Sequence, residues 1–477
     1  MIILTDNNNG KQSAHKAVIR GYGEANAQEH LTNLNELGNL TLAELSQSEN
    51  LLTFPLNLGD SKDLKDKQSE PIFRFESIKC DNDGDIIDAT IRTSNIMGFF
   101  GYKGTQVAIL SRFASNSTQR DSTADSAPKP DFFLHYMLGK IAHLNFFKNF
   151  PHSASDNAAF DLLPYLLPNA LREALRQGLF RAYVRRRYDD ANVRGTIDIA
   201  RHISRHIPFD GAVSYATREH SHDNALTQLI RHTIEYVSTK PLGRVILQSM
   251  LDEVAQIRLA TPLYDKASCR AILSQNLHLL RHPYYDKYEP LRRLCVQILR
   301  HERLGYGRDD ERVSGVLFDG AYLWEEYLWS VLESAKLGFK HPRNKSSKGA
   351  IDLLDSMLDS NKWAVYPDFY IENKAVLDAK YKRLEGGDSI DSGDKHQIIS
   401  YIYTLGAKMG GFVYPLSADS SECESEIGSV KNAAILKSAV YKFALKIPQN
   451  AESLKDFADK IQKSENCLKQ ILLKFLT

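Results

Sequence analysis

Residues 366–380 read YPDFYIENKAVLDAK, and this stretch decides the fold of the last third of the chain. Two short apolar runs flank the polar residues 372–374. This pattern predicts a β-hairpin with a three-residue connection. Asn373 tolerates the left-handed backbone conformation that such a connection needs. The sequence around the stretch is therefore interpreted outward from a hairpin.

The turn fixes the register of the two strands. In this register Tyr370 faces Val376, and Asp368 lies opposite Asp378. Lys380 follows two residues after Asp378, so both side chains point to the same face of their strand. Two carboxylates and one ammonium then share one partly buried side of the hairpin. Because a buried pair of like charges is unfavourable unless a cation neutralises it, the pattern indicates a site for a divalent cation.

The residue types at this site suit phosphodiester hydrolysis. Carboxylates such as Asp368 and Asp378 are the ligands that Mg²⁺ prefers, with Mn²⁺ as the alternative ion, and the carbonyl of Ala379 is a further candidate ligand. A hard divalent cation activates water and stabilises the charge of the transition state. Lys380 is placed to orient the water and to stabilise the same charge. We expect a metal-dependent phosphodiester hydrolase.

An Asp-x-Lys pattern by itself is more often a surface ion pair on a strand than a catalytic pair. The chain contains another one at residues 63–65, in a polar segment without a strand pattern, and we assign no site to it. Three features distinguish residues 378–380. A Pro-Asp dipeptide stands before the first strand, the register opposes the two aspartates, and the following helix carries Gln397 and Tyr401 one turn apart on one face.

Composition and charge limit the class of protein. The 477 residues are 43% apolar and 25% charged, which is typical of a soluble globular protein with two to four domains. A net charge of +1 excludes a nucleic-acid binder that is basic throughout, so such a surface must be local. Five scattered cysteines without C-x-x-C or zinc spacing indicate a reduced protein. Without a signal-peptide pattern or a long apolar run, we expect a cytoplasmic protein and no membrane span.

The hydrophobic pattern changes along the chain and predicts an α/β fold class, multidomain α+β. Residues 1–130 contain a β-rich part over 72–113 followed by a linker. Residues 131–312 are mainly helical, with a β interruption of two short strands within 180–199. Residues 313–477 follow the order helix, strands, helix, strand, which predicts a mixed α/β domain with a central sheet.

The spacing of the candidate residues resembles the PD-(D/E)xK nuclease superfamily. The resemblance rests on a Pro-Asp dipeptide, an Asp-Ala-Lys tripeptide ten residues later, and a Gln-x-x-x-Tyr helix. It implies a restriction-endonuclease-like domain with a central mixed sheet over residues 313–477. In that superfamily the preceding helix often supplies a glutamate. The residues that the resemblance implies are Asp368, Asp378, Ala379 and Glu325 around the metal, and Lys380, Gln397 and Tyr401 as further catalytic residues.

The resemblance narrows to the McrC family, the nuclease subunit of McrBC-type restriction systems. It is carried by VRGTIDIARH at 193–202, DNAL at 223–226 and LDAKYK at 377–382, and it covers roughly residues 85–445. It implies cleavage of double-stranded DNA together with a McrB-like AAA+ GTPase hexamer, whose GTP hydrolysis the chain stimulates. The chain has no Gly-x-x-x-x-Gly-Lys-Ser/Thr loop, which agrees with a separate motor. An arginine within 181–205 is a candidate for the stimulation, and a surface or DNA-phosphate role is an equal alternative.

Two alternatives stay open. A non-catalytic activator of the motor would keep the nuclease fold only as structure, and the intact Asp/Asp/Lys set argues against it. A LlaJI-type site-specific restriction subunit would cut an unmethylated sequence. The chain does not separate methylated from unmethylated targets, because the reading module is expected on the partner.

Overall fold

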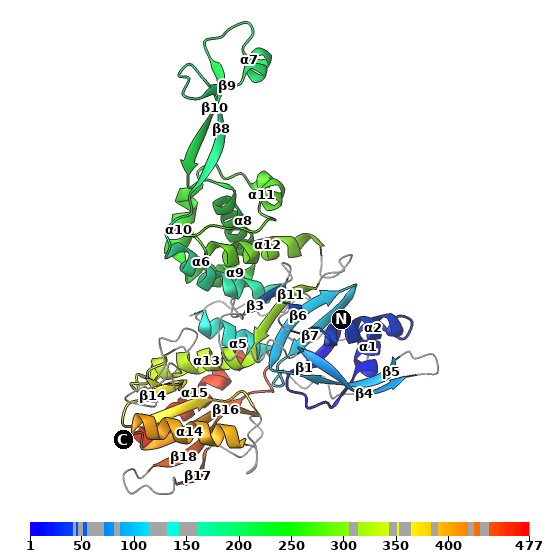
Figure 1. Ribbon diagram of the computed structural model, residues 1–477, viewed down its shortest axis with the longest axis vertical. Helices are drawn as coiled ribbons and strands as arrows, with labels where there is room; N and C mark the ends of the chain where they lie inside the picture. The colour runs from blue at the N-terminus through cyan, green and yellow to red at the C-terminus, as the bar shows by residue number, and fades with distance from the viewer. Residues whose placement is uncertain are drawn as a thin grey trace, which may run out of the picture. The chain divides into compact units, whose positions relative to one another are not determined.

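The computed structural model divides into two compact units, shown in Figure 1. Unit 1 comprises Met1–Leu162 together with Leu304–Thr477, and unit 2 is Leu163–Arg303. The residues that the structure describes are 1–41, 44–45, 51–54, 71–80, 86–114, 131–142, 160–304, 313–342, 351–352, 364–382, 390–417, 424–429 and 438–476. The Asp-x-Lys pattern at residues 63–65 lies outside the described residues.

The amino-terminal part of unit 1 contains a five-stranded sheet in the order β1-β7-β6-β11-β3. Its strands are β1 (Ile2–Thr5), β3 (Leu51–Phe54), β6 (Ile96–Tyr102), β7 (Thr105–Leu110) and β11 (Ser314–Asp319). A second sheet has the order β2-β5-β4. Its strands and the two nearby helices are β2 (Gln12–Ser13), β4 (Phe73–Cys80), β5 (Ile86–Thr93), α1 (Ala14–Tyr22) and α2 (Ala27–Gly38).

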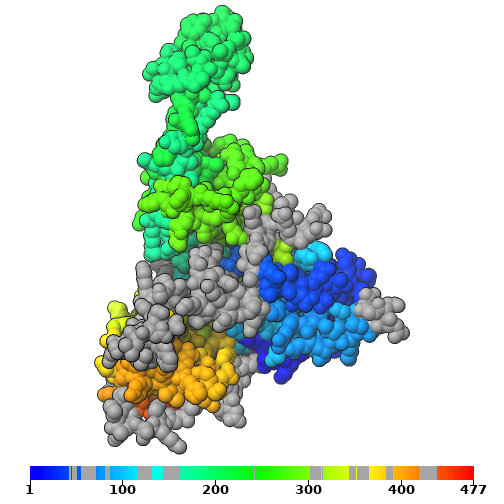
Figure 2. Space-filling view, in the orientation of Figure 1, coloured from blue at the N-terminus to red at the C-terminus, as the bar shows by residue number. Residues whose placement is uncertain are grey.

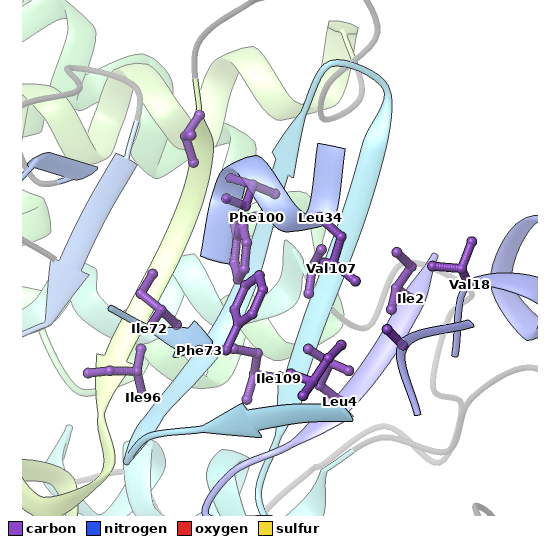
Figure 3. Close-up of a cluster of buried hydrophobic side chains, with 14 of the residues drawn as sticks. Ile2, Leu4, Val18, Leu34, Ile72, Phe73, Ile96, Phe100, Val107 and Ile109 are labelled. Atoms are coloured by element: carbon purple, nitrogen blue, oxygen red, sulfur yellow. The ribbon is translucent and has the colours of Figure 1, made fainter. Parts of the chain in front are cut away.

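A continuous apolar core joins these elements. Alternate residues of the strands point inward, so Ile2, Phe73, Phe100 and Ile109 belong to the same buried cluster as Leu34 of α2 (Figure 3). Their side chains are almost fully removed from water. Burial of this kind stabilises a fold by roughly 1.5–3 kcal/mol for each large apolar side chain.

Strand β11, which precedes the carboxy-terminal part, is paired within the amino-terminal sheet. It pairs antiparallel with β6 and parallel with β3, although it lies far from both in sequence. Helix α5 (Phe132–Ile141) likewise belongs to unit 1 and packs against α13 (Gly320–Ala335) and α15 (Leu454–Leu476) of the carboxy-terminal part. The domain boundaries expected after residues 130 and 312 differ from this division. A strand with hydrogen-bonded neighbours on both sides cannot be assigned from its own sequence to the sheet that holds it.

The carboxy-terminal part of unit 1 contains a mixed sheet in the order β14-β15-β16-β18-β17. Its elements are α13 (Gly320–Ala335), β14 (Phe369–Ile371), β15 (Ala375–Ala379), α14 (Ser392–Leu405), β16 (Met409–Ser417), β17 (Glu424–Ser429), β18 (Ala439–Ile447) and α15 (Leu454–Leu476), with β12 (Ile351–Asp352) and β13 (Ala364–Val365) as a separate two-stranded pair. The order helix, strands, helix, strand that the sequence predicts for this region is confirmed.

Helices cover both faces of this sheet. Tyr401 and Ile402 of α14 pack with Val376, Phe412 and Val440 on one face. On the opposite face, Phe475 of α15 contacts Phe443 of β18. Helix α13 lies against β15, and the Trp324 indole N–H donates to the carbonyl of Val413 on β16. The central strands are therefore buried on both sides, as their continuous apolar sequence requires.

Unit 2 is a helical body that carries a β-ribbon. Its helices are α6 (Leu167–Leu175), α8 (Ala225–Thr239), α9 (Pro241–Gln248), α10 (Leu251–Ala260), α11 (Cys269–Gln275) and α12 (Tyr288–Leu304), with short 3₁₀ turns at Phe160–Leu166 and Lys266–Ser268. The ribbon consists of β8 (Ala182–Asp190) and β10 (Val213–Ser221), with β9 (Thr196–Ile197) at its edge. It extends away from the helices of unit 2 and carries α7 (Ile199–Arg205) near its far end (Figure 1).

The structure is thus a mixed α/β protein, as expected for the fold class. The β interruption expected within 180–199 is present, but its long partner strand is β10, beyond that range. In the described ranges, no helix combines the length and the apolar character needed to cross a membrane.

Candidate active site

The predicted hairpin is confirmed with its predicted register. Tyr370 pairs with Val376, and the connection between β14 and β15 is formed by residues 372–374. Asn373 has a φ of 58°, the left-handed conformation expected for it. Asp368 immediately precedes β14, and Asp378 lies within β15. The local sequence is therefore sufficient to place the two aspartates at the same end of the hairpin.

Lys380 joins the hairpin to the helix that follows it. Its Nζ atom lies 2.7 Å from Asp378 Oδ2 and 3.0 Å from Asp394 Oδ1. Asp378 is 3% exposed, and Asp394, in the first turn of α14, is buried as well. An ammonium shared by two buried carboxylates is held in one position, because losing either contact would leave a charge uncompensated.

A chain of hydrogen bonds continues from Lys380 along α14. The Lys380 ammonium donates to Gln397 Oε1 at 3.2 Å, and Gln397 Nε2 donates to the Tyr401 hydroxyl at 2.7 Å. The Tyr401 hydroxyl in turn donates to the carbonyl of Tyr366 at 2.8 Å, just before the Pro-Asp dipeptide. The structure thus brings Gln397 and Tyr401 to the same site as the hairpin residues.

Asp368 lies in the most unfavourable electrostatic position. Its Oδ2 accepts a hydrogen bond of 2.7 Å from the backbone N–H of Ala379. Burial and the charges of Glu325 and Asp378 raise the pKa of Asp368 well above its usual range. Glu325 is on α13, so a helix, a strand entry and a strand contribute three carboxylates to one region. Three carboxylates that disfavour one another's charge indicate a place where a cation is expected.

The Asp378–Lys380 pair is shifted by the same forces. Burial raises the pKa of Asp378, and the Lys380 ammonium acts in the opposite direction. Burial tends to lower the pKa of Lys380, but Asp378 and Asp394 outweigh it and raise that pKa above its ordinary value. The contacts with Asp378 and Asp394 thus favour the charged form of Lys380.

The residues fit a hard divalent cation in type. Asp368, Asp378 and Glu325 provide carboxylate oxygens, the donors that Mg²⁺ and Mn²⁺ take, and burial together with the charges of Glu325 and Asp378 raises the pKa of Asp368. Among the described residues, no group of three His, Cys, Asp or Glu side chains already has the arrangement of a metal site. This agrees with the contacts, since Lys380 holds Asp378 and the Ala379 N–H holds Asp368.

A family model described as McrBC 5-methylcytosine restriction system component matches residues 91–415, more than half of the chain. The chain belongs to this McrBC family. The relation to McrBC-type systems that the sequence motifs predict is thereby confirmed. The matched range begins in β5 and ends in β16, so it includes the hairpin, α14 and all of unit 2. No curated protein matches this member of the McrBC family.

Two solved structures are similar to this McrBC-family chain. One is a refined half-complex from a tetradecameric assembly of Thermococcus gammatolerans McrB AAA+ hexamers with bound McrC, at 15% identity and a TM-score of 0.43, covering 98% of this chain and 99% of that chain. The other is a cryo-EM structure of the Thermococcus gammatolerans McrBC complex, at 16% identity and a TM-score of 0.30, covering 71% of this chain and 89% of that chain.

Two residues at this candidate site were not predicted from sequence. Asp394 binds both Lys380 and Lys382 at 3.0 Å, and its position three residues before Gln397 on one helix face was the available signal. His341 donates from Nδ1 to the carbonyl of Asp368 at 2.8 Å, with its Nε2 3.7 Å from Glu325. No local pattern marks His341, because it reaches the site only through the fold.

Proposed function

We propose that this chain is the Mg²⁺-dependent DNA endonuclease subunit of a McrBC-like, GTP-dependent restriction system. The observation that carries the proposal is the set of Asp368, the buried Asp378 and Lys380 on one hairpin, linked to α14 through Gln397. Membership in the McrBC family supports the same class of activity. Mn²⁺ is the expected substitute ion.

The chain's own residues divide the work. Asp368 and Asp378, with Glu325 beside them, would hold Mg²⁺, which when bound supplies charge stabilisation and a more acidic water. Lys380, fixed by Asp394 and Gln397, presents its ammonium to the phosphate and orients the attacking water. Tyr401 holds Gln397 in place and ties it to the backbone of Tyr366.

We also infer that the carboxy-terminal part of unit 1 is a PD-(D/E)xK domain. Strands β15 and β16 are parallel and are connected through α14, so the helix crosses over the face that carries Asp378 and Lys380. The helix α13, with Glu325, precedes the hairpin. This order of helix, hairpin, crossover helix and parallel strand is the arrangement that the superfamily resemblance implies.

The partner in this proposal is a McrB-like AAA+ GTPase hexamer, and the tip of the ribbon in unit 2 supports it. The ribbon tip comprises residues 189–214. Its exposed large apolar side chains are 39–66% exposed and are Val193, Ile197, Ile199, Ile203, Ile207 and Phe209. The space-filling view shows the tip standing free of the helices of unit 2 (Figure 2). An apolar cluster this exposed marks a protein-binding surface.

The ribbon below its tip adds a basic face. Arg185 pairs across the ribbon with Arg218, and Arg187 follows on the same side. All three are exposed, and within the described residues none of them forms an ion pair. We propose that an arginine of this face stimulates GTP hydrolysis by the partner. Double-stranded DNA is then delivered to the nuclease site by the motor, which agrees with a net charge of only +1.

Substitution of Asp378 tests the nuclease assignment. Asp378→Ala should reduce cleavage of methylated plasmid by at least about a hundredfold, because one metal ligand and the counterion of Lys380 are lost together. The assay uses the full chain with its partner, GTP and Mg²⁺. Asp63→Ala, in the Asp-x-Lys pattern at residues 63–65, is the matched control and should cut like the wild type.

Undiminished cleavage by Asp378→Ala would refute the assignment of the nuclease site to this hairpin. The partner assignment is tested separately by GTP hydrolysis. The full chain alone should show none, and adding it to the partner should raise the partner's rate. Turnover by the isolated chain would contradict the assignment of hydrolysis to a separate motor.

A further inference from the structure

Tyr381 follows Lys380 directly, yet its side chain belongs to the other half of unit 1. The residue is 2% exposed. Its hydroxyl lies 3.8 Å from Met97 Sδ on β6, and burial, followed by the negative charge of Asp6, the residue after β1, raises its pKa. Tyr381 thus leaves the nuclease hairpin and inserts into the amino-terminal sheet, on the strand side opposite to that of Lys380.

Arg112 covers the ring of Tyr381. Its guanidinium carbon lies 4.6 Å from the ring centroid, and the Arg112 side chain is only 4% exposed. Its charge is balanced by Asp6, with 4.0 Å between Arg112 Nη1 and Asp6 Oδ2, and the backbone N–H of Arg112 donates to Asp6 Oδ1 at 2.5 Å. Neither Nη1 nor Nη2 has a hydrogen-bond partner within the described residues. A desolvated cation of this kind interacts strongly with an aromatic face.

The backbone of Lys380 is fixed from a third direction. The carbonyl of Val413 on β16 accepts both the Lys380 N–H at 2.9 Å and the Trp324 indole N–H at 3.2 Å. The first residue of α13, Gly320, packs closely against Tyr381. A Cβ atom at this position would lie only 2.9 Å from the Tyr381 ring and 2.7 Å from the carbonyl oxygen of Asn95. Little freedom is left for the main chain at residues 380–381.

We propose that Tyr381, Arg112 and Asp6 form a latch through which the amino-terminal sheet positions Lys380 for catalysis. The three are positioning residues, since none of them faces the carboxylates of the site. The expected change in kcat rests on the proposed nuclease function. The expected change in the position of Lys380 rests only on the contacts described above.

The expected effect follows from geometry. Lys380 acts through the placement of one ammonium, and a displacement of about 1 Å can lower a rate by as much as a hundredfold. Loss of the Tyr381 hydroxyl removes the interactions with Asp6 and Met97 but keeps the ring beneath Arg112. Tyr381→Phe should therefore lower kcat for cleavage by about tenfold and leave KM for DNA unchanged.

A matched control exists in the same unit. Tyr136 is also 2% exposed, and its hydroxyl donates to the buried carboxylate of Glu465 at 2.9 Å. Tyr136→Phe removes an equivalent hydroxyl from a buried carboxylate, away from Lys380. Thermal unfolding should shift by a similar amount in both variants, whereas only Tyr381→Phe should lose kcat. An equal loss of kcat in Tyr136→Phe would show general loosening and overturn the inference.

A second readout does not depend on cleavage. Acylation of Lys380 by a water-soluble N-hydroxysuccinimide ester, followed by peptide mass spectrometry of the full chain, should be several-fold faster in Tyr381→Phe than in the wild type. Lys408, which is exposed, provides the internal reference and should react equally in both. Unchanged Lys380 labelling together with unchanged kcat would refute the latch.

The two failures can be told apart. If the wild type shows no metal-dependent cleavage with its partner, the proposed function fails, and Lys380 labelling still decides on the latch. If the wild type cleaves, Asp378→Ala does not, and Tyr381→Phe matches the wild type in kcat and labelling, only the latch fails. Arg112→Met, which removes the charge above the ring, should act in the same direction as Tyr381→Phe.

Discussion

The hairpin site of unit 1 and the ribbon tip of unit 2 arrange their side chains in opposite ways. At the hairpin, charged groups are buried and apolar groups surround them, with Asp378 3% exposed. At the tip, apolar side chains such as Phe209 are 66% exposed, while the polar groups bond to one another beneath them. The carboxylate of Asp189, for example, accepts hydrogen bonds from Arg201, Arg205 and Ser214.

The two regions differ in what their own residues leave uncompensated: negative charge at the hairpin and exposed apolar surface at the tip. At the hairpin, burial and the charges of Glu325 and Asp378 raise the pKa of Asp368, and the proposed function assigns a small cation to this place. At the tip, charged groups form ion pairs while apolar side chains are exposed, and the proposed function assigns this surface to a partner protein. A chain that needs both to function suits a subunit whose chemistry depends on a partner.

The largest effect is expected from removing the ammonium of Lys380, which pairs with the buried Asp378. Lys380→Met should lower kcat by at least about a hundredfold. In chelator it should also lose about 3 kcal/mol of unfolding free energy, because Asp378 keeps its burial and loses its counterion. Mg²⁺ should then raise the melting temperature of Lys380→Met more than that of the wild type.

Lys382→Met is the matched control for that comparison. Lys382 contacts Asp391 and Asp394 but is 45% exposed at its side chain, so its removal should change stability and kcat little. Equal losses in the two variants, measured by thermal unfolding and plasmid cleavage, would mean that burial of the ion pair does not distinguish this site.

An intermediate effect is expected at the tip. The double substitution Ile203→Ser, Phe209→Ser should weaken stimulation of the partner's GTP hydrolysis by about tenfold, which corresponds to about 1.4 kcal/mol of binding. Because both side chains are exposed, unfolding free energy should stay within about 0.5 kcal/mol of the wild type. Leu259→Ser, at an exposed position on α10 of the same unit, is the control and should leave stimulation unchanged.

The smallest effect concerns the polar network beneath the tip. Hydrogen bonds to Asp210 and Asp189 raise the pKa of His206 above 6.5, against burial. Protonated His206 therefore stabilises the tip fully below the unfolded pKa of 6.5, and this stability is lost as the pH rises through the folded pKa. Hydrogen exchange of α7, corrected for intrinsic rates, should show lower protection at pH 8.5 than at pH 6. The dependence should vanish in His206→Gln, and its persistence there would assign it to another group.

Local sequence was sufficient for the hairpin. Its register, the left-handed Asn373 and the face shared by Asp378 and Lys380 all follow from a period of two and one turn. The helices before and after it were equally local, since each shows its own apolar stripe. These parts determine the candidate site.

Other parts depend on contacts between distant residues and could not be predicted. Strand β8 was recognised as extended, but nothing in it indicates that its partner is β10, across the ribbon tip. His341 and Tyr381 act through tertiary contacts that no spacing rule describes. Asp394 is intermediate, since its helix was predicted and only its contact with Lys380 was not.

The position of β11 has a consequence for how the protein is made. The ribosome releases β1, β3, β6 and β7 first, but the strand that belongs between β6 and β3 emerges only after all of unit 2. Until then two strand edges lack their partner, and exposed edges invite pairing with other chains. Unit 2 can fold before β11 takes its position between β6 and β3. The amino-terminal sheet of unit 1 is therefore completed only after unit 2 has been synthesised, and a nascent chain interrupted before residue 314 would lack both β11 and the candidate site.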